Sequence, residues 1–397
     1  MTINSDPIVI VSAARTPMGG FQGELASLTA PELGAAAIAA AVARAGINAD
    51  TVDEVLMGCV LAAGLGQAPA RQAALAAGLS QATPCTTLNK MCGSGMQAAI
   101  LAHDLLLAGS AKRVIAGGME SMSNAPYLLD RARAGYRMGH GRVLDHMFLD
   151  GLEDAYDKGR LMGTFAEDCA QANDLSRAAQ DEYAIASLTR AQAAMEKGLF
   201  RDEIVPVSVT IAKQERVIEH DEQPPKARPA KIATLKPAFR EGGTVTAANA
   251  SSISDGAAAL LLMRRSEAQA SGLRPLAVIH GHAAFADAPG LFPQAPVGAI
   301  EKLMQRTGWQ LDEVDLFEIN EAFAVVALVT MARLGLPADK VNVHGGACAL
   351  GHPIGASGAR ILVTLLGALR QRGLRRGVAA ICIGGGEATA MAIESLE

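Results

Sequence analysis

The sequence GINADTVDEVLMG at residues 46–58 returns later in the chain as GWQLDEVDLFEIN at residues 308–320. The two stretches share a leading glycine, the spacing of their apolar residues and an aspartate in register, Asp53 in the first and Asp315 in the second. The offset between the two aspartates is 262 residues. Because self-similarity at a fixed offset is typical of a duplicated structural unit, we expect two related halves.

The stretches that follow the two copies are also alike. Each half continues with a Ser-Gly pair, then a helical pattern, and then an apolar strand that ends in glycines. The helical patterns cover 96–109 and 359–371, and the strands cover 114–120 and 379–387. A short β-branched run at 341–343 is expected as a further strand. Strands that alternate with helices indicate sheets covered by helices, so the predicted fold class is α/β.

The composition excludes several functional classes. The chain has 397 residues, 50% of them hydrophobic and 19% charged, and its length suits about two to three ordinary domains. A formal net charge of −5 argues against general binding of nucleic acid, whose phosphates require Lys and Arg. The sequence has no uncharged apolar run of about 18 residues that could span a bilayer, and no signal-peptide pattern. We therefore expect a cytoplasmic protein that binds neither membrane nor nucleic acid.

Residues 121–246 differ in character from both halves. They are rich in methionine and charge around 122–162, and they then show a helix pattern at 176–197 with Ser176 as its N-cap. A Pro-rich, basic stretch follows, and we interpret the whole segment as an inserted loop domain over the active face. The expected division is an N-terminal half at 1–120 and 247–272, a loop domain at 121–246, and a C-terminal half at 273–397.

Three reactive side chains lie beside glycines: Cys92 in NKMCGSG, His352 in GHPIGASG and Cys382 in CIGGG. The six cysteines show no Cys-x-x-Cys spacing, which favours free thiols over disulfides or a zinc site. Cys92 directly precedes an expected helix, whose N–H groups and dipole would favour a thiolate. His352 lies at the matching place in the second half and could take the thiol proton or pair with the thiolate as imidazolium. The glycines after Cys382 leave backbone N–H groups open to an anionic oxygen.

Each of these signals also has a structural explanation when taken alone, because free cysteines are often buried core residues and a histidine in a glycine loop is usually a turn residue. Their combination indicates acyl transfer through sulfur. Together with NEAFA at 320–324 and NASSISDGA at 249–257, the three motifs resemble the thiolase family of coenzyme A-dependent acyltransferases. The resemblance runs from about residue 8 to residue 392 and implies the five-layered α-β-α-β-α thiolase fold, which agrees with the duplication.

Within this family, GMESMSNAPY at 118–127 and FPQAP at 292–296 resemble the acetyl-CoA C-acetyltransferase branch. The resemblance implies a reversible Claisen condensation of two acetyl-CoA molecules to acetoacetyl-CoA, or the reverse thiolysis. Cys92 would be the nucleophile that becomes acylated, and His352 the base that activates it. Cys382 would be the second acid/base. A water held by Asn320 would stabilise the enolate together with His352, and the N–H groups of Cys92 and Gly384 would face the thioester oxygen.

The resemblance also implies where coenzyme A binds as a substrate, with no tightly bound cofactor and no metal. The stretch from 224 to 240 carries five Lys and Arg residues and no Asp or Glu, and it could hold the nucleotide phosphates. A solvated basic face is the alternative for each of these side chains. The residues implied to contact the coenzyme are Ser251, Arg228, Lys231, Phe239, Met162 and Phe323. Leu161 stands where short-chain thiolases commonly carry His, and Leu188 stands where potassium-activated relatives use Tyr, which disfavours potassium dependence.

Three other functions share part of this pattern. A 3-ketoacyl-CoA thiolase for longer chains would share every catalytic residue. A condensing enzyme that acts on carrier-protein thioesters typically has a second His at the place of Cys382, so the sequence disfavours it. A non-catalytic acyl-CoA-binding protein would not need the full set of Cys92, Asn320, His352 and Cys382. The resemblance finally implies a homotetramer, a dimer of dimers joined through the 121–165 segment.

Overall fold

The strands of the two halves follow the same spatial order. A computed structural model describes residues 6–211 and 213–396. The first half supplies, in order, β1 (Ile8–Arg15), β10 (Ser254–Arg264), β5 (Arg113–Ser121), β3 (Glu54–Gly58) and β4 (Cys85–Leu88). The second half supplies β11 (Ala277–Ala286), β14 (Glu387–Ser395), β13 (Arg376–Ile383) and β12 (Leu316–Ile319). β1 pairs with β11, and this pairing joins the two halves into one sheet. A short strand, β2 (Gly19–Gly20), pairs with β10 and is the tenth strand of the sheet.

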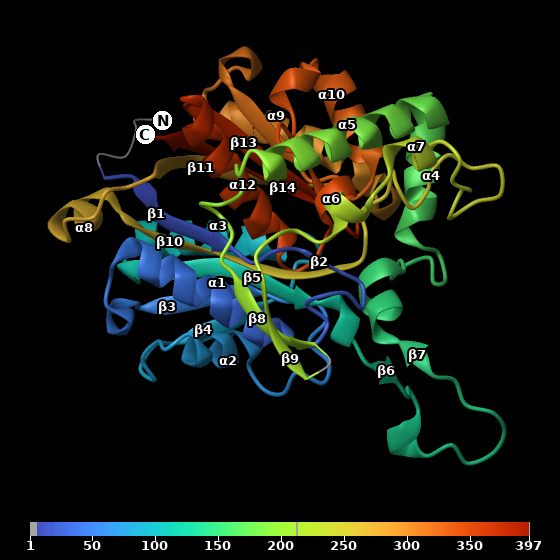
Figure 1. Cartoon of the computed structure of the whole chain (residues 1–397), viewed down its shortest axis with the longest axis horizontal. Helices are drawn as coiled ribbons and strands as arrows, with labels where there is room; N and C mark the ends of the chain where they lie inside the picture. Colours follow the sequence, from blue (N-terminus) through green and yellow to red (C-terminus); the bar gives the residue numbers. More distant parts are fainter. Residues whose placement is uncertain (1–5, 212, 397) are drawn as a thin grey trace.

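Helices and sheet halves alternate in five layers, as Figure 1 shows. The outer helices on the first half are α1 (Ala30–Ala45) and α2 (Pro69–Ala76), and those on the second half are α9 (Ala295–Thr307) and α10 (Ala324–Leu334). Between the two sheet halves lie α3 (Ser94–Ala108) and α12 (Ser357–Arg372). Three apolar clusters fill the spaces between these layers. The predicted five-layered α/β fold is confirmed.

Alternating side chains of a single strand supply two of these clusters. On β10, Ala257, Ala259 and Leu261 pack toward the outer helices, whereas Ala258 and Leu260 pack toward the inner helices. A strand that is buried on both faces has a continuous apolar sequence, which here is AAALLLM at residues 257–263. Small residues in the strand allow the inner helices to approach the sheet closely.

The duplicated aspartates have the same structural role in the two halves. One carboxylate oxygen of Asp53 accepts hydrogen bonds from the backbone N–H groups of Lys112 and Arg113, at 2.9 and 2.8 Å. The corresponding oxygen of Asp315 accepts from Arg375 and Arg376, at 3.0 and 2.8 Å. In each half, the aspartate therefore fixes the start of the central strand that leads to the active face.

The inner helices cross at their first turns. A Cβ atom at Gly95 of α3 would lie 2.7 Å from the backbone nitrogen of Ala359 on α12, and a Cβ at Gly358 would collide with the backbone nitrogen of Met96. Only glycine allows this close approach from both sides. The two Ser-Gly pairs of the sequence repeat thus become one reciprocal contact, which brings the start of α3 and the start of α12 together.

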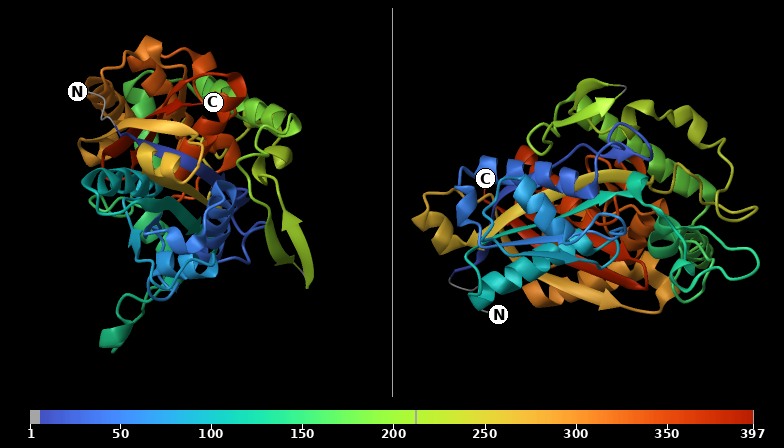
Figure 2. Two further views of the ribbon diagram at one scale, coloured as in Figure 1. Left: turned by 90° about the vertical axis from the view of Figure 1, so that its left-hand side faces the viewer. Right: turned by 90° about the horizontal axis from the view of Figure 1, so that it is seen from below.

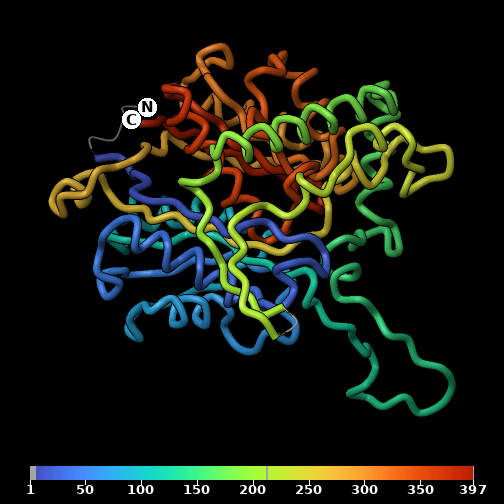
Figure 3. Tube along the Cα trace, in the orientation of Figure 1, coloured from blue at the N-terminus to red at the C-terminus, as the bar shows by residue number. Residues whose placement is uncertain are grey.

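The segment from 121 to 246 leaves the layered body and returns. Residues around β6 (Tyr127–Leu128) and β7 (Leu144–Asp145) extend away from it, as the Cα trace shows (Figure 3). The helix expected at 176–197 is confirmed as α5 (Arg177–Glu196), with Ser176 as N-cap, and it packs on α10 and α11 (Ala347–Leu350). The other elements are α4 (Met162–Ala172), β8 (Val207–Ile211), β9 (Gln214–Ile218), α6 (Gln223–Lys226) and α7 (Pro229–Ile232).

A buried ion-pair cluster fastens this segment to the first half. Arg15 of β1 is fully buried and contacts Glu203 at 2.8 Å and Asp221 at 2.7 Å. The β8–β9 hairpin lies along the same half (Figure 2), where Val207 and Val209 join the outer apolar cluster. The domain boundaries given above stay a prediction, but the chain of the first half clearly continues after the excursion, because β10 lies between β1 and β5.

One expected strand does not form. Residues 341–343 were predicted as a strand, yet Val341 makes only an isolated parallel bridge with Phe317. The prediction was wrong because Asn342 has a left-handed backbone, with φ of 47°, and its side chain bonds the backbone of Ile319. The segment still occupies the place beside β12 that β4 occupies beside β3. In the part of the chain that the structure describes, no helix is long and apolar enough to cross a membrane.

Candidate active site

Cys92 lies in a tight turn directly before α3. Met91 has a left-handed backbone, with φ of 46°, and such conformations are uncommon for residues other than glycine. Ser94 holds the turn, because its Oγ accepts a hydrogen bond from the Lys90 N–H at 2.8 Å and donates to the Met91 carbonyl at 2.6 Å. Backbone strain of this kind is frequent at functional sites. The turn presents the Cys92 thiol just ahead of Gly93, the N-cap residue of α3.

Burial raises the pKa of the Cys92 thiol to about 11, because a thiolate loses its solvation there. The backbone N–H groups of Gly384 and of Cys92 itself lower this pKa, and the nearby Glu120 carboxylate raises it. Of the two states expected for Cys92, a neutral thiol with a basic His352 and a thiolate beside an imidazolium, burial favours the neutral thiol.

The hydrogen bonds of His352 determine its tautomer. Ser357 Oγ donates to the Pro353 carbonyl at 2.9 Å and lies 2.5 Å from His352 Nδ1. Because a hydroxyl has a single proton, Ser357 must accept from Nδ1–H, which leaves the lone pair on Nε2. Nε2 is buried and has no hydrogen-bond partner among the described residues. Burial, helped by the Arg360 charge, lowers the pKa of His352 to about 3, so the resting imidazole is neutral and Nε2 carries a free lone pair.

The crossing of α3 and α12 brings the Cys92 turn and the His352 loop together. Cys92 packs against an apolar cluster that includes Ile354, two residues after His352. The other buried members of this cluster are Val60, Leu61, Met122 and Met147. Residues from both halves and from the loop segment therefore surround the Cys92 thiol.

Cys382 and Asn320 reach the same region from the second half. Cys382 is buried near the end of β13, and burial raises the pKa of its thiol well above the ordinary value, with a further contribution from nearby Cys92. Asn320 follows β12 and is buried, and in the described part of the chain its side-chain Oδ1 and Nδ2 both lack a hydrogen-bond partner. A buried amide without partners is costly, and it is usually satisfied by water or ligand. The site thus holds two protonated thiols, a neutral imidazole and an unpaired amide.

Sequence comparison agrees with this arrangement. The model of the thiolase N-terminal domain matches residues 8–266, and the model of the thiolase C-terminal domain matches residues 273–395. The chain belongs to the thiolase family. The resemblance proposed from the motifs is confirmed, as is the assignment to an enzyme family of acyltransferases.

Several relatives of this thiolase match over its full length. "Acetyl-CoA acetyltransferase 2" of Arabidopsis thaliana is 50% identical and spans 100% of this chain and 98% of the relative. "Acetyl-CoA acetyltransferase" of Escherichia coli K12 is 52% identical and spans 98% and 99%. Among solved structures, the acetyl-CoA acetyltransferase of Bacillus anthracis superposes with a TM-score of 0.96 at 41% identity, over 98% of this chain and 99% of that one.

A cavity of about 370 Å³ in this thiolase contains two of the residues expected at the coenzyme. Arg228 and Lys231 line it, together with Ser252 and Cys348. Two other basic residues of the 224–240 stretch are engaged elsewhere. Lys226, at the rim of the cavity, bonds Glu222, and Arg240 pairs with Asp168. Arg228 and Lys231 line the cavity and form no ion pair with the described residues, whereas Lys236, the fifth basic residue of the stretch, is not among the lining residues.

The remaining expected contacts form an apolar wall next to Gly384. A Cβ at Gly384 would lie 3.6 Å from Met162 Sδ, so Met162 borders the loop that contacts the Cys92 sulfur. The rings of Phe239 and Phe323 make an edge contact with centroids 6.0 Å apart. Ser251 is different from the others, because its hydroxyl donates to the Ala322 carbonyl at 2.9 Å. It is Ser252, the next residue, that lines the cavity.

Two residues that the geometry connects to the catalytic loops received no role from sequence reasoning. Ser357 fixes the tautomer of His352, and its only signal was the Ser-Gly pair shared by the two halves. Glu120 is the second-last residue of β5, and its only signal was a charged residue at the end of an apolar run. Leu161 immediately precedes α4, and its carbonyl accepts from Thr164 Oγ1 at 2.7 Å.

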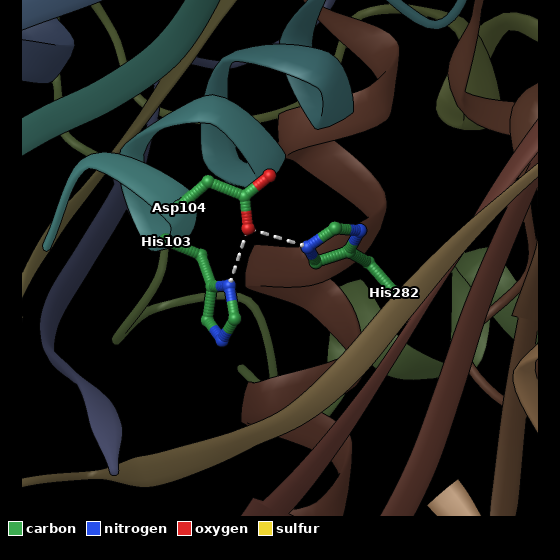
Figure 4. Close-up of side chains that lie close together, drawn as sticks. All are labelled: His103, Asp104 and His282. Carbon is green, nitrogen blue, oxygen red and sulfur yellow. Dashed lines mark hydrogen bonds and ion pairs between the residues drawn. The ribbon is translucent and has the colours of Figure 1, made fainter. Parts of the chain in front are cut away.

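Three metal-ligating side chains also gather elsewhere in the described part of the chain, where Figure 4 shows them. Asp104 Oδ1 lies 3.1 Å from His103 Nδ1 and 3.0 Å from His282 Nε2. The two rings meet edge to face with centroids 5.1 Å apart. One carboxylate oxygen thus accepts from both imidazoles, and the cluster is explained as a hydrogen-bonded link between α3 and β11.

Proposed function

We propose that this thiolase is an acetyl-CoA C-acetyltransferase, which condenses two acetyl-CoA molecules to acetoacetyl-CoA and CoA, or runs the reverse thiolysis. The observation that carries the proposal is the second thiol. Cys382 lies beside Cys92 in one buried site, and a carbon–carbon bond requires a base for the α-proton while Cys92 holds the acyl group. The names of the full-length relatives support the same activity.

In the first half-reaction, the Cys92 sulfur attacks the thioester carbonyl of acetyl-CoA while His352 Nε2 takes the thiol proton. The carbonyl oxygen gains negative charge and lies toward the N–H groups of Cys92 and Gly384. The carbon–sulfur bond to CoA then breaks, and Cys382 gives its proton to the departing CoA thiolate. The enzyme now carries an acetyl group on Cys92, an imidazolium at His352 and a thiolate at Cys382.

In the second half-reaction, the Cys382 thiolate removes an α-proton from a second acetyl-CoA. The enolate oxygen receives hydrogen bonds from His352 Nε2–H and from a water on the Asn320 amide, which has no other partner in the protein. The α-carbon attacks the acetyl group, and the Cys92 thiolate leaves and takes its proton back from His352. All groups return to their resting protonation states. Coenzyme A acts as a substrate throughout, with its phosphates placed at Arg228 and Lys231.

A comparison of substrates tests this assignment against its alternative, a 3-ketoacyl-CoA thiolase of longer chain-length range. We expect kcat/KM for thiolysis of acetoacetyl-CoA to exceed that of 3-ketohexanoyl-CoA and longer substrates by about 10-fold or more, because a pocket closed by apolar side chains discriminates by about that factor per added group. Steady-state kinetics on a series of 3-ketoacyl-CoA substrates measures the ratio. Equal or higher values for the long substrates would favour the alternative.

Two further features stay predictions. We expect a homotetramer built as a dimer of dimers, because the extended part around β6 and β7 exposes Tyr127, Leu129, Met138 and Val143, and exposed apolar groups on an extension suit association. Light scattering after size exclusion should give four chain masses, and a monomer would refute it. The cytoplasmic location expected from the sequence would be tested by cell fractionation.

A further inference from the structure

Glu120 is a buried carboxylate that joins three chain segments near the active site. It lies on β5 and is fully buried. Its Oε2 accepts hydrogen bonds from the Val60 N–H at 3.0 Å and from the Gly355 N–H at 2.8 Å, and its Oε1 accepts from the Leu61 N–H at 3.1 Å. The segment after β3, the end of β5 and the loop of His352 therefore meet on one side chain.

The loop of His352 lies in direct contact with the Glu120 carboxylate. A Cβ at Gly355 would lie 2.6 Å from Glu120 Oε2 and 3.0 Å from the Cα of Cys59, so only glycine fits between them. Gly355 is three residues after His352, and the intervening Ile354 packs against Cys92. A change in the position of the carboxylate would therefore shift the backbone that carries the imidazole.

Glu120 has hydrogen bonds from N–H groups but no cation among its bonding partners, which is unusual for a buried carboxylate. Burial raises its pKa to about 7, while the three N–H groups act in the opposite direction. The weak Cys59 Sγ contact at 3.8 Å completes its surroundings. The N–H hydrogen bonds of Glu120 therefore come from the backbone of two separate segments, one of which is the His352 loop.

We propose that Glu120 is a positioning residue: its carboxylate, through the Gly355 N–H, holds the His352 loop where Nε2 can take the Cys92 proton. The proposal rests on the proposed function, in which Cys92 is the nucleophile and His352 its base.

The test compares Glu120→Gln with Glu167→Gln. Glu167 is also a buried carboxylate that accepts backbone N–H groups, those of Thr244 and Val245, but it has no bond to either catalytic loop. The rate of Cys92 alkylation by iodoacetamide is measured between about pH 7 and pH 11 by mass spectrometry of the Cys92 peptide, which needs no coenzyme. We expect Glu120→Gln to slow Cys92 alkylation at the lower end of this range, because His352 no longer lies where it can take the Cys92 proton, whereas Glu167→Gln keeps the wild-type profile.

Steady-state kinetics supply the second measurement. The glutamine amide cannot accept from all three N–H groups, so we expect kcat to fall about 10- to 100-fold with KM for acetoacetyl-CoA changed less than about threefold. If Glu120→Gln does not fold, the same measurements are made on Glu120→Asp, because aspartate keeps the carboxylate but has a shorter side chain. It should then show the same slower alkylation together with a reduced kcat.

An alkylation profile that is the same in wild type and Glu120→Gln, or a wild-type kcat in either Glu120 variant, would overturn the proposal. Wild-type enzyme that is inactive on acetoacetyl-CoA would instead overturn the proposed function. The alkylation measurement would still report on Glu120 in that case, so the two failures can be told apart.

Discussion

Cys92→Ala should lower kcat for acetoacetyl-CoA thiolysis by about 10,000-fold or more and abolish the acetyl adduct that forms when the protein is mixed with acetyl-CoA. The sulfur is the atom that receives the acyl group, and removal of a nucleophile typically costs that much. Cys382 is not expected to replace it, because burial raises the pKa of the Cys382 thiol well above its ordinary value. Mass spectrometry of the intact protein and of the Cys92 peptide measures the adduct directly.

Cys85→Ala is the matched control for this result. Cys85 is also a partly buried free thiol, but it lies on the edge strand β4. Its removal should leave both the adduct and the turnover within about twofold of wild type, as is usual for substitutions away from a site. An adduct that persists in Cys92→Ala, or is lost in Cys85→Ala, would assign the nucleophile to a different cysteine.

Cys382→Ala should separate the two half-reactions. The Cys92 thiol and His352 Nε2 both remain, so the acetyl adduct on Cys92 should still form, although more slowly because the departing CoA thiolate must take its proton from water. Condensation and thiolysis should fall by about 1,000-fold, since loss of a general acid/base costs about 100- to 10,000-fold. Incubation with labelled acetyl-CoA, followed by mass spectrometry and an acetoacetyl-CoA assay, measures both steps on one sample.

The outcome that would remove Cys382 from the mechanism is an unimpaired rate of carbon–carbon bond formation. Loss of the adduct together with turnover would be equally informative, because it would show that Cys382 is needed for acylation itself. Cys382 is almost completely buried between β12 and β14, so the thermal stability of the variant must be compared with that of wild type. An Ala in place of a buried Cys leaves only a small cavity.

The repeat in the sequence predicted the architecture well. Asp53 and Asp315 were aligned from spacing alone, and both bond the backbone at the start of a central strand. The bounds of α5 followed from local signals, Ser176 and the Lys197-Gly198 stop. Such features are predictable because they depend on residues close together in the chain.

The protonation states and the finer contacts of the site were not predictable in the same way. The position of Cys92 before a helix suggested a thiolate, whereas burial by segments from four distant parts of the chain keeps it a thiol. The hydroxyl of Ser251 was expected near the coenzyme, but it bonds Ala322, which is 71 residues away. Desolvation and hydrogen bonds between remote segments have no local sequence signal, so they emerge only when the chain is folded.

The place of β10 in the sheet has a consequence for the order of events during synthesis. β10 pairs with β1 on one side and β5 on the other, yet it follows β5 by more than a hundred residues along the chain. A nascent chain that has released only residues up to 250 therefore has both neighbours exposed without the strand that joins them. Translation proceeds at about 5 to 20 residues per second. For several seconds, therefore, β1 and β5 of the first half are present without β10, the strand that pairs with both.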